Sequence, residues 1–191
     1  GYSVFRSMNA IEMSDVVLVV LDATKEVSEQ DVRIAGYVHE AKKPSVIVVN
    51  KWDEKTMSKE DFTNILKEKL SFMDYFKVIF VSALTGAGLS SIMTNVDEVF
   101  ENASRRISTG VLNDILQDAI LKSEPPSRNG KKCKILFATQ PSTNPPKFVF
   151  FCKDPTLIGF SYERYLENRL REKVDFSGTP IELVFKGKEE E

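Results

Sequence analysis

Residues 45–53 read Ser45-Val46-Ile47-Val48-Val49-Asn50-Lys51-Trp52-Asp53, and this stretch decides the fold. Its first five residues carry no charge and are mostly β-branched, which is typical of a strand buried on both faces of a parallel sheet. The four residues that follow lie at the carboxyl end of the predicted strand, where open α/β sheets bind their ligands. The stretch therefore predicts a parallel α/β sheet with a ligand site at 50–53.

Helices and strands alternate around this stretch as far as residue 103. The hydrophobic pattern predicts helices over 3–14, 28–40, 58–71 and 89–103, and further strands over 15–21 and 77–81. Ser28 and Ser58 are suited to cap their helices. The β-α-β-α-β-α order predicts a parallel sheet with right-handed crossovers. Because the strand at 15–21 is almost entirely apolar, we expect it to be buried on both faces.

A polar junction at 104–112 separates this part from a smaller second module. Its expected elements are a helix over 110–122 capped by Thr109, a loop over 124–130, strands over 134–139, 148–152 and 181–185, and a helix over 160–174. This α-β-β-α-β order predicts an α+β sandwich with helices on one side of a three-stranded sheet. We expect Phe148, Phe150 and Phe151 to be core residues rather than base-stacking residues, because a small covered sheet needs aromatic side chains.

Asn50, Lys51 and Asp53 form an Asn-Lys-x-Asp tetrad, the motif by which many GTPases recognise guanine. The Asp53 carboxylate can accept both guanine donors, N1–H and the N2 amine, in a charge-assisted pair. Adenine lacks both donors, and a site built for such donors rejects the analogue by about 10⁴–10⁵-fold. We expect Asn50 to donate toward guanine N7 and Lys51 to lie along one face of the base.

A second motif, Ser82-Ala83-Leu84, follows the predicted strand at 77–81. We expect the Ala83 N–H to donate to guanine O6, Ser82 to brace the turn and Leu84 to contact the other face of the base. The tetrad has an alternative interpretation as a polar turn, with Asn50 in an Asx turn and Asp53 capping the next helix. The order strand, tetrad, strand, Ser-Ala favours the guanine site.

The composition is that of an ordinary globular protein, with 42% hydrophobic and 28% charged residues. No apolar run approaches the roughly 20 residues that span a bilayer, and the first residues show no signal-peptide pattern. Two cysteines, Cys133 and Cys152, suit a reducing cytosol, so we expect free thiols and a cytoplasmic protein. No His or Cys cluster has the spacing of a metal site.

The two halves differ in charge. Residues 1–103 carry a net charge of −5 and residues 104–191 a net charge of +3, which favours different partners for each half. In the second half, Arg128, Lys131 and Lys132 cluster around the Pro/Gly-rich loop. They are candidates for contact with an RNA backbone; a protein-facing role and a solvated charged face are the alternatives.

Together these features resemble the C-terminal part of the Der/EngA family, GTPases with two tandem GTPase domains followed by a KH-like domain. The resemblance covers essentially every residue, and its most specific motifs are Gly-Tyr-Ser-Val-x-Arg at 1–6, Val-Leu-Asp-Ala at 20–23, Glu-Gln-Asp-x-Arg-Ile-Ala-Gly at 29–36, Val-Asn-Lys-Trp-Asp at 49–53, Ser-Ala-Leu at 82–84, Pro-Pro-Lys-Phe-Val-Phe-Phe at 145–151, Ser-Tyr-Glu-Arg-Tyr-Leu-Glu-Asn-Arg at 161–169 and Phe-x-Gly-Thr-Pro-Ile at 176–181. It implies that 1–103 is the back half of the second GTPase domain and 104–191 the KH-like domain.

The resemblance also implies a function. Members of this family bind and hydrolyse GTP as a switch in ribosome assembly, centred on the large subunit. It therefore implies GTP or GDP as the ligand and a ribosomal subunit as the partner, through rRNA, ribosomal proteins or both, with no role for DNA. The six residues of the two base-recognition motifs match the family at these positions.

The sequence departs from the family's pattern in three places. The 191 residues contain no G-x-x-x-x-G-K-[ST] phosphate loop, and the second module contains no G-x-x-G clamp for RNA. Many GTPases have Ser-Ala-Lys where this chain has Ser-Ala-Leu at 82–84. We therefore expect Mg²⁺ to bind only with residues that precede Gly1, this polypeptide alone not to hydrolyse GTP, and the strand at 15–21 to form an exposed apolar edge.

Two functions of different classes fit the sequence. The first is a GTPase switch with a ribosome-docking module. The second is a non-enzymatic RNA- or protein-binding protein whose nucleotide domain is only a scaffold. A nucleotide kinase or other P-loop enzyme does not fit, because the sequence offers no catalytic acid–base constellation.

Overall fold

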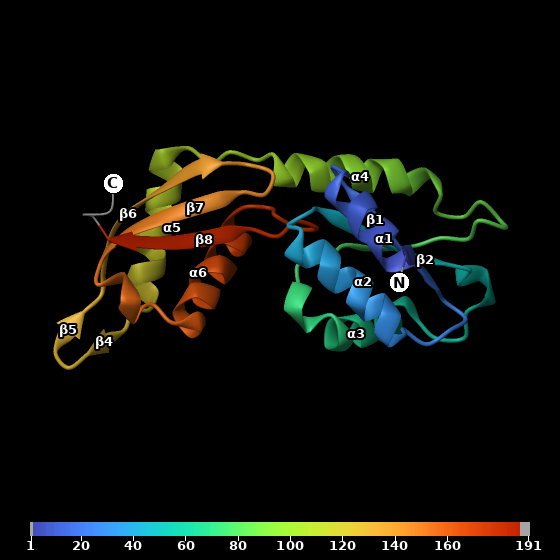
Figure 1. Cartoon of the computed structure of the whole chain (residues 1–191), viewed down its shortest axis with the longest axis horizontal. Helices are drawn as coiled ribbons and strands as arrows, with labels where there is room; N and C mark the ends of the chain where they lie inside the picture. The colour runs from blue at the N-terminus through green and yellow to red at the C-terminus, as the bar shows by residue number, and fades with distance from the viewer. Residues whose placement is uncertain (1, 188–191) are drawn as a thin grey trace. The chain divides into compact units, whose positions relative to one another are not determined.

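The computed structural model describes residues 2–187 and divides into two compact units (Figure 1). The first contains the chain through Ala103 together with the short segment Phe176–Pro180. The second contains Ser104–Asp175 and the chain from Ile181 onward. The segment 176–180, which the sequence interpretation assigned to the second module, thus packs with the first.

The first unit is a parallel three-stranded sheet flanked by helices (Figure 1). Its elements are α1 (Tyr2–Glu12), β1 (Val17–Asp22), α2 (Glu29–Glu40), β2 (Ser45–Asn50), a 3₁₀ turn at Trp52–Glu54, α3 (Lys59–Lys69), a 3₁₀ turn at Ser71–Met73, β3 (Val78–Phe80) and α4 (Ser90–Ala103). The strand order is β1-β2-β3, and both neighbouring pairs are parallel. The predicted alternation of strand and helix is confirmed.

The strand β2 is buried along its length, but β1 is not. Side chains of α2 and α3 cover one face of the sheet, with Ile11 of α1 in the same cluster, and α4 packs on the other face through Val99. In β1, Leu18 and Val20 are 42% and 61% exposed. The prediction that β1 is buried on both faces is therefore wrong, because β1 is an edge strand of the described sheet and α4 packs on β2 and β3 instead. The predicted apolar edge is confirmed.

Hydroxyl side chains cap the amino-terminal ends of three helices. Ser28 accepts a hydrogen bond from the Asp31 N–H at 3.1 Å, and Asp31 accepts one from the Ser28 N–H at 2.9 Å, which makes a full capping box. Ser58 caps α3 by accepting from the Asp61 N–H at 3.0 Å. Both predicted caps are confirmed. In the second unit the cap of α5 is Ser108 and not Thr109, because the Ser108 hydroxyl accepts from the Val111 N–H.

The second unit places two helices on one face of a three-stranded sheet. Its elements are α5 (Thr109–Lys122), a small hairpin of β4 (Ser127–Arg128) and β5 (Lys131–Lys132), β6 (Lys134–Ser142), β7 (Lys147–Lys153), a 3₁₀ turn at Pro155–Leu157, α6 (Phe160–Lys173) and β8 (Glu182–Gly187). The sheet order is β6-β7-β8, antiparallel for the first pair and parallel for the second. The α-β-β-α-β order is confirmed, and the predicted loop at 124–130 contains β4 of the short hairpin.

The phenylalanines of β7 point to both faces of this sheet. Phe148 and Phe150 are buried core residues, as predicted, and Phe150 lies against Leu116 of α5 and Leu166 of α6. Phe151 is only half-buried and stacks on Phe137 at a ring-centroid distance of 4.6 Å. The core prediction therefore does not hold for Phe151, because successive strand residues face opposite sides of a sheet.

The segment Phe176–Pro180 closes the first unit at the amino ends of its strands. The Gly178 carbonyl accepts from the Ser45 N–H, and the Gly178 N–H donates to the Tyr75 carbonyl, both at 2.8 Å. Phe176 and Thr179 are buried. Gly178 has φ +80°, and a Cβ there would lie 2.2 Å from Val99 Cγ1, so only glycine fits.

Candidate nucleotide-binding site

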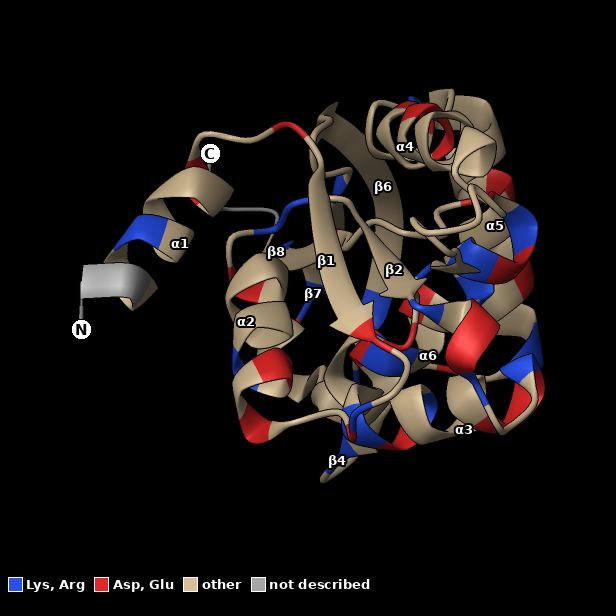
Figure 2. Cartoon of the chain, turned by 90° about the vertical axis from the view of Figure 1, so that its right-hand side faces the viewer, with Lys and Arg blue, Asp and Glu red and all other residues tan. Residues whose placement is uncertain are grey.

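Two polar loops meet at the carboxyl edge of the parallel sheet. Asn50 is the last residue of β2 and is the register partner of Asp22 at the end of β1. The chain then turns through Lys51, whose φ of 59° lies in the left-handed region, and the Trp52 N–H donates to the Val81 carbonyl beyond β3. This backbone bond joins the two predicted motifs. In Figure 2 the arrowheads of β1 and β2 point the same way, and charged segments follow them.

Asp53 and Ser82 form the direct link between the motifs. The Ser82 hydroxyl donates to Asp53 Oδ1 at 2.6 Å. The same hydroxyl accepts from the Thr85 N–H at 3.2 Å, which agrees with the predicted bracing of the turn. Ser82 is buried, whereas Asp53 is exposed. A carboxylate has about four acceptor positions, so Asp53 keeps acceptor capacity toward solvent.

Asn50 and Ala83 form the second link. The Ala83 N–H donates to Asn50 Oδ1 at 3.0 Å. The Asn50 side chain thus ties the two loops together. This N–H, which was predicted to donate to guanine O6, is thus engaged with Asn50.

Lys51 contacts a carboxylate to which the sequence analysis gave no role. Its Nζ lies 3.0 Å from Asp22 Oδ2, and Thr24 donates to Asp22 Oδ1 through both its N–H and its hydroxyl. The Thr24 hydrogen bonds and the Lys51 ammonium hold the pKa of Asp22 well below its ordinary range, and Asp22 raises the pKa of Lys51. The position of Asp22 at the carboxyl end of the neighbouring predicted strand could have indicated this contact, because the carboxyl ends of parallel strands meet at one edge of the sheet.

Trp52, the third residue of the tetrad, packs into a cluster of aromatic rings. The Trp52 ring lies 4.5 Å from that of Phe80 and 6.0 Å from that of Phe62, measured between centroids. The Lys55 ammonium lies 5.6 Å from the Trp52 ring. Leu84 is 86% exposed and so presents an apolar side chain at the edge of the site. The structure therefore brings five of the predicted residues into linked loops and leaves Leu84 projecting into solvent.

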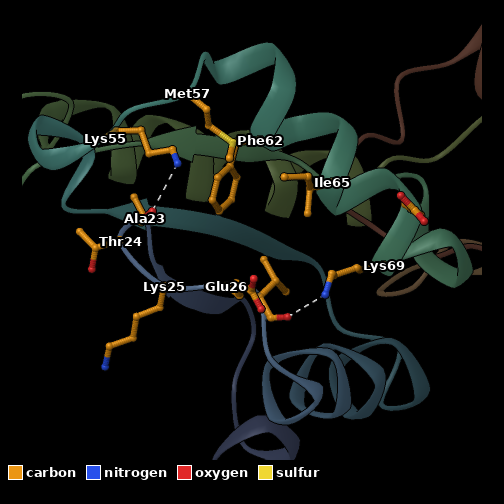
Figure 3. Close-up of a pocket in the computed structure, with 11 residues that line it drawn as sticks. Ala23, Thr24, Lys25, Glu26, Lys55, Met57, Phe62, Ile65 and Lys69 are labelled. Carbon is orange, nitrogen blue, oxygen red and sulfur yellow. Dashed lines mark hydrogen bonds between the residues drawn. The ribbon is translucent and has the colours of Figure 1, made fainter.

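A pocket of about 460 Å³ adjoins this edge (Figure 3). Its lining includes Ala23 and Thr24 beyond β1 and Lys55, Phe62 and other residues on or before α3. The Lys55 Nζ lies 3.5 Å from the Ala23 carbonyl, as the dashed line in Figure 3 shows. The base-recognition residues are outside its lining, so this pocket is a neighbour of the candidate site and not the site itself.

Three basic residues of the second unit lie on the β4–β5 hairpin. Arg128 pairs with Lys131 in the antiparallel register, and both are exposed, as is Lys132. The turn residues Asn129 and Gly130 have φ values of 52° and 76°, the conformation of a tight hairpin turn. The structure thus gathers the three predicted RNA-contact candidates on one projecting hairpin.

Within residues 2–187, no group of three or more His, Cys, Asp or Glu side chains is arranged to hold a metal ion. No helix in this range is both long and apolar enough to cross a membrane. Cys133 and Cys152 are buried free thiols, and burial raises the pKa of both, to about 12 for Cys152.

The sequence matches two protein-family models, one on each half. Residues 4–102 match the elongation factor Tu GTP-binding domain, and residues 106–186 match the KH-domain-like C-terminal domain of EngA bacterial GTPase enzymes. The chain belongs to the Der/EngA GTPase family. The resemblance found from the motifs is confirmed.

Curated relatives named GTPase Der match almost the whole chain. The proteins from Moorella thermoacetica and Clostridium perfringens strain SM101 are both 48% identical, over 97% and 99% of this chain. That from Acetivibrio thermocellus is 49% identical over 100% of it. These matches cover 43–44% of the relatives, so the chain spans less than half of their length.

Proposed function

We propose that this chain belongs to a GTPase that binds GTP and GDP and acts in assembly of the large ribosomal subunit. The observation that carries the nucleotide part is the Asp53 carboxylate, held by Ser82 at 2.6 Å and exposed at the carboxyl edge of a parallel sheet. A carboxylate fixed in this way can accept N1–H and the N2 amine of guanine together. A ribosome-assembly role also places the protein in the cytoplasm.

Asn50 and Ala83 complete the proposed recognition of the base. Because Asn50 Oδ1 accepts from Ala83, the Nδ2 donor of the same carboxamide is the group that we propose for guanine N7. The Ala83 N–H reaches guanine O6 by sharing its hydrogen between the two acceptors. We propose that Lys51 and Leu84 lie on opposite faces of the base.

Asp53→Asn tests guanine recognition in a polypeptide extended to the length of the relatives. An amide donates where the carboxylate accepts, so GTP affinity is expected to fall at least a hundredfold while xanthosine triphosphate affinity rises. Competition with GTP, ATP and xanthosine triphosphate measures both. Asp97→Asn on α4 is the matched control and should change neither affinity. Unchanged GTP binding by Asp53→Asn would instead support the alternative that the nucleotide domain is only a scaffold.

We propose that the 191-residue polypeptide alone binds GTP weakly and does not hydrolyse it. Triphosphate binding and hydrolysis depend on phosphate-loop amides, the loop lysine and Mg²⁺, and these residues contain no phosphate-loop motif. A titration with labelled GTP and Mg²⁺ tests this. Micromolar binding with turnover would refute it.

For the docking role, we propose that the β4–β5 hairpin contacts ribosomal RNA or a ribosomal protein. Its exposed Arg128, Lys131 and Lys132 support contact with a phosphate backbone. Replacing all three by glutamine is expected to weaken ribosomal-subunit binding and to flatten its salt dependence. The control is the double variant Lys122→Gln/Lys173→Gln on the helices of the same unit. An unchanged salt dependence in the hairpin variant would contradict the proposed contact between this hairpin and a phosphate backbone.

A further inference from the structure

The second unit has a sheet face that its helices do not cover. Helices α5 and α6 pack on the face that carries Phe150, and in Figure 1 the strands cross in front of α5. Residues paired across the strands share a face, so Phe137 and Phe151 lie together on the opposite face. Their rings are stacked, with centroids 4.6 Å apart and planes inclined by 19°. Phe137 remains 41% exposed.

Three lysines surround this aromatic pair. Lys134 is the register partner of Lys153, two residues from Phe151 on the same face, and Lys186 of β8 is the register partner of Phe151. All three are exposed, and within residues 2–187 no side-chain hydrogen bond or ion pair engages their ammonium groups. They gather where β6 begins and where β7 and β8 end. We call these five residues the aromatic–lysine corner.

The stability of the second unit does not account for the aromatic–lysine corner. Burial of Phe148 and Phe150 already fills the space between sheet and helices. An exposed phenylalanine loses part of the free energy that burial provides, and like charges on directly paired strand residues, here Lys134 and Lys153, are destabilising. An aromatic platform bordered by like-charged residues therefore points to a ligand with flat apolar groups and negative charge.

We propose that the aromatic–lysine corner binds a single-stranded RNA segment, with a base stacked on Phe137 and the flanking phosphates at the lysines. This inference rests on the proposed docking of the unit on ribosomal RNA and names a second contact surface, apart from the β4–β5 hairpin. Unpaired bases stack on aromatic side chains of open sheets, and cationic residues track the backbone. A duplex would not fit, because its bases are already stacked on one another.

Acidic residues near these lysines in the sequence give a further test of an anionic ligand. Among the described residues, Asp154 is the acidic side chain that follows Lys153 in the chain, and it has φ 56°. The sequence also continues beyond the described residues with Glu189-Glu190-Glu191. Removing these three glutamates is expected to tighten RNA binding, because it lowers the negative charge of the chain that binds the RNA.

Fluorescence anisotropy of the full chain with a 5′-labelled 12-nucleotide single-stranded RNA tests the proposal. Phe137→Leu keeps an apolar side chain and removes the stacking ring, so affinity is expected to fall about five- to hundredfold. The control is Phe160→Leu, which alters a phenylalanine that is 77% exposed in the same unit and should leave affinity unchanged. Urea unfolding checks that each variant is folded.

The salt dependence of RNA binding tests the lysines separately. Lys153→Gln/Lys186→Gln is expected to reduce the slope of log affinity against log salt by about 1.4, since each single-strand phosphate contact contributes about 0.7. The helix variant Lys122→Gln/Lys173→Gln should not change the slope.

Two results overturn the proposal: no binding of this RNA by the wild-type chain, or equal RNA affinity of Phe137→Leu and wild type. Equal RNA affinity together with loss of a ribosomal-protein contact in Phe137→Leu would make the corner a protein-docking surface instead. None of them bears on guanine recognition, which Asp53→Asn tests alone. Loss of RNA binding in the hairpin variant with Phe137→Leu unaffected would keep the proposed docking and reject the corner.

Discussion

The two ends of the parallel sheet in the first unit carry loops of opposite character. At the carboxyl end, Asp53 and Leu84 are exposed, and the loops are joined mainly through side chains such as Ser82. At the amino end, the segment Phe176–Pro180 is largely buried and is joined through backbone groups of Gly178. The first arrangement leaves acceptor capacity for a ligand, whereas the second is closed by backbone hydrogen bonds.

Residues at the amino end of the sheet stabilise the fold, whereas residues at the carboxyl end offer hydrogen-bonding groups to a ligand. A buried backbone segment must have its N–H and C=O groups paired, and Gly178 meets this requirement at two strand ends at once. A ligand loop needs only enough internal bonds to hold its side chains in place. Substitutions at the amino end should therefore act mainly on stability, and substitutions at the carboxyl end should act mainly on nucleotide affinity.

The largest effect is expected for Gly178→Ala. The new Cβ would lie 2.2 Å from Val99 Cγ1, and the residue has φ +80°, so we expect destabilisation of about 2–5 kcal/mol. Urea unfolding followed by fluorescence of Trp52, the single tryptophan and a residue of this unit, measures it. Gly36→Ala in α2, where an added Cβ meets nothing within 4 Å, should stabilise by up to about 1 kcal/mol. Equal unfolding midpoints for Gly178→Ala and Gly36→Ala would contradict the proposed role of the amino end in stability.

Ser82→Ala should act mainly on nucleotide binding. It removes the hydroxyl that donates to Asp53 at 2.6 Å, a hydrogen bond to a charged group worth about 1.5–3 kcal/mol. In a polypeptide of the relatives' length, we expect GTP affinity to fall about tenfold or more, measured by calorimetry. Ser91→Ala, which removes another local hydroxyl bond at the start of α4, is the control. A loss of stability as large as that in Gly178→Ala, with GTP affinity intact, contradicts the assignment.

Leu84→Ala tests an exposed apolar contact. Because the side chain is 86% exposed, stability should change by less than about 0.5 kcal/mol. Guanine-nucleotide affinity is expected to fall about three- to tenfold through lost contact with the base, equal to about 1 kcal/mol. The control is Leu121→Ala, at a position that is 84% exposed in the other unit. Identical GTP affinities for the two variants would remove Leu84 from the site.

The smallest effect is expected for Asp22→Asn, and it depends on pH. Thr24 and Lys51 lower the pKa of Asp22 in the folded chain, so its contribution to stability is present above the ordinary value of about 4 and is lost as pH falls further. The stability difference between wild type and Asp22→Asn should thus be constant above about pH 5 and narrow progressively as the pH falls below about 4. Unfolding midpoints across this range measure it, with Glu101→Gln as the control. A difference that stays constant with pH would show that the Lys51 pair is not involved.

Much of the fold could be predicted from local pattern. The β-branched run before Asn50 predicted a strand buried on both faces, and β2 is one; Ser28 and Ser58 cap their helices as expected. The same rule was wrong for β1, because burial of an apolar face depends on whether another element covers it. The Thr109 cap was wrong by one residue, since Ser108 and Thr109 offer similar hydroxyls and only backbone geometry selects between them.

The candidate site was predicted in part. The two motifs indicated Asn50, Asp53 and Ser82, because their residue types match guanine chemistry. Asp22 was not included, because a carboxylate at a strand end has no signature of its own until the register places it beside Lys51. The bond between Ala83 and Asn50 likewise depends on how two loops 33 residues apart approach each other.

The sequence by itself determined the secondary-structure elements, the parallel order of the first sheet and the chemistry of its carboxyl edge, because periodicity, capping and functional groups are local properties. Only the tertiary structure decided that Phe176–Pro180 belongs to the first unit, that β1 is exposed on one face, and that Phe151 stacks on Phe137 opposite the helices. These facts depend on which distant segments meet in space. Asn102 donates to the Ser177 carbonyl across 75 residues of sequence, and no local pattern encodes such a contact.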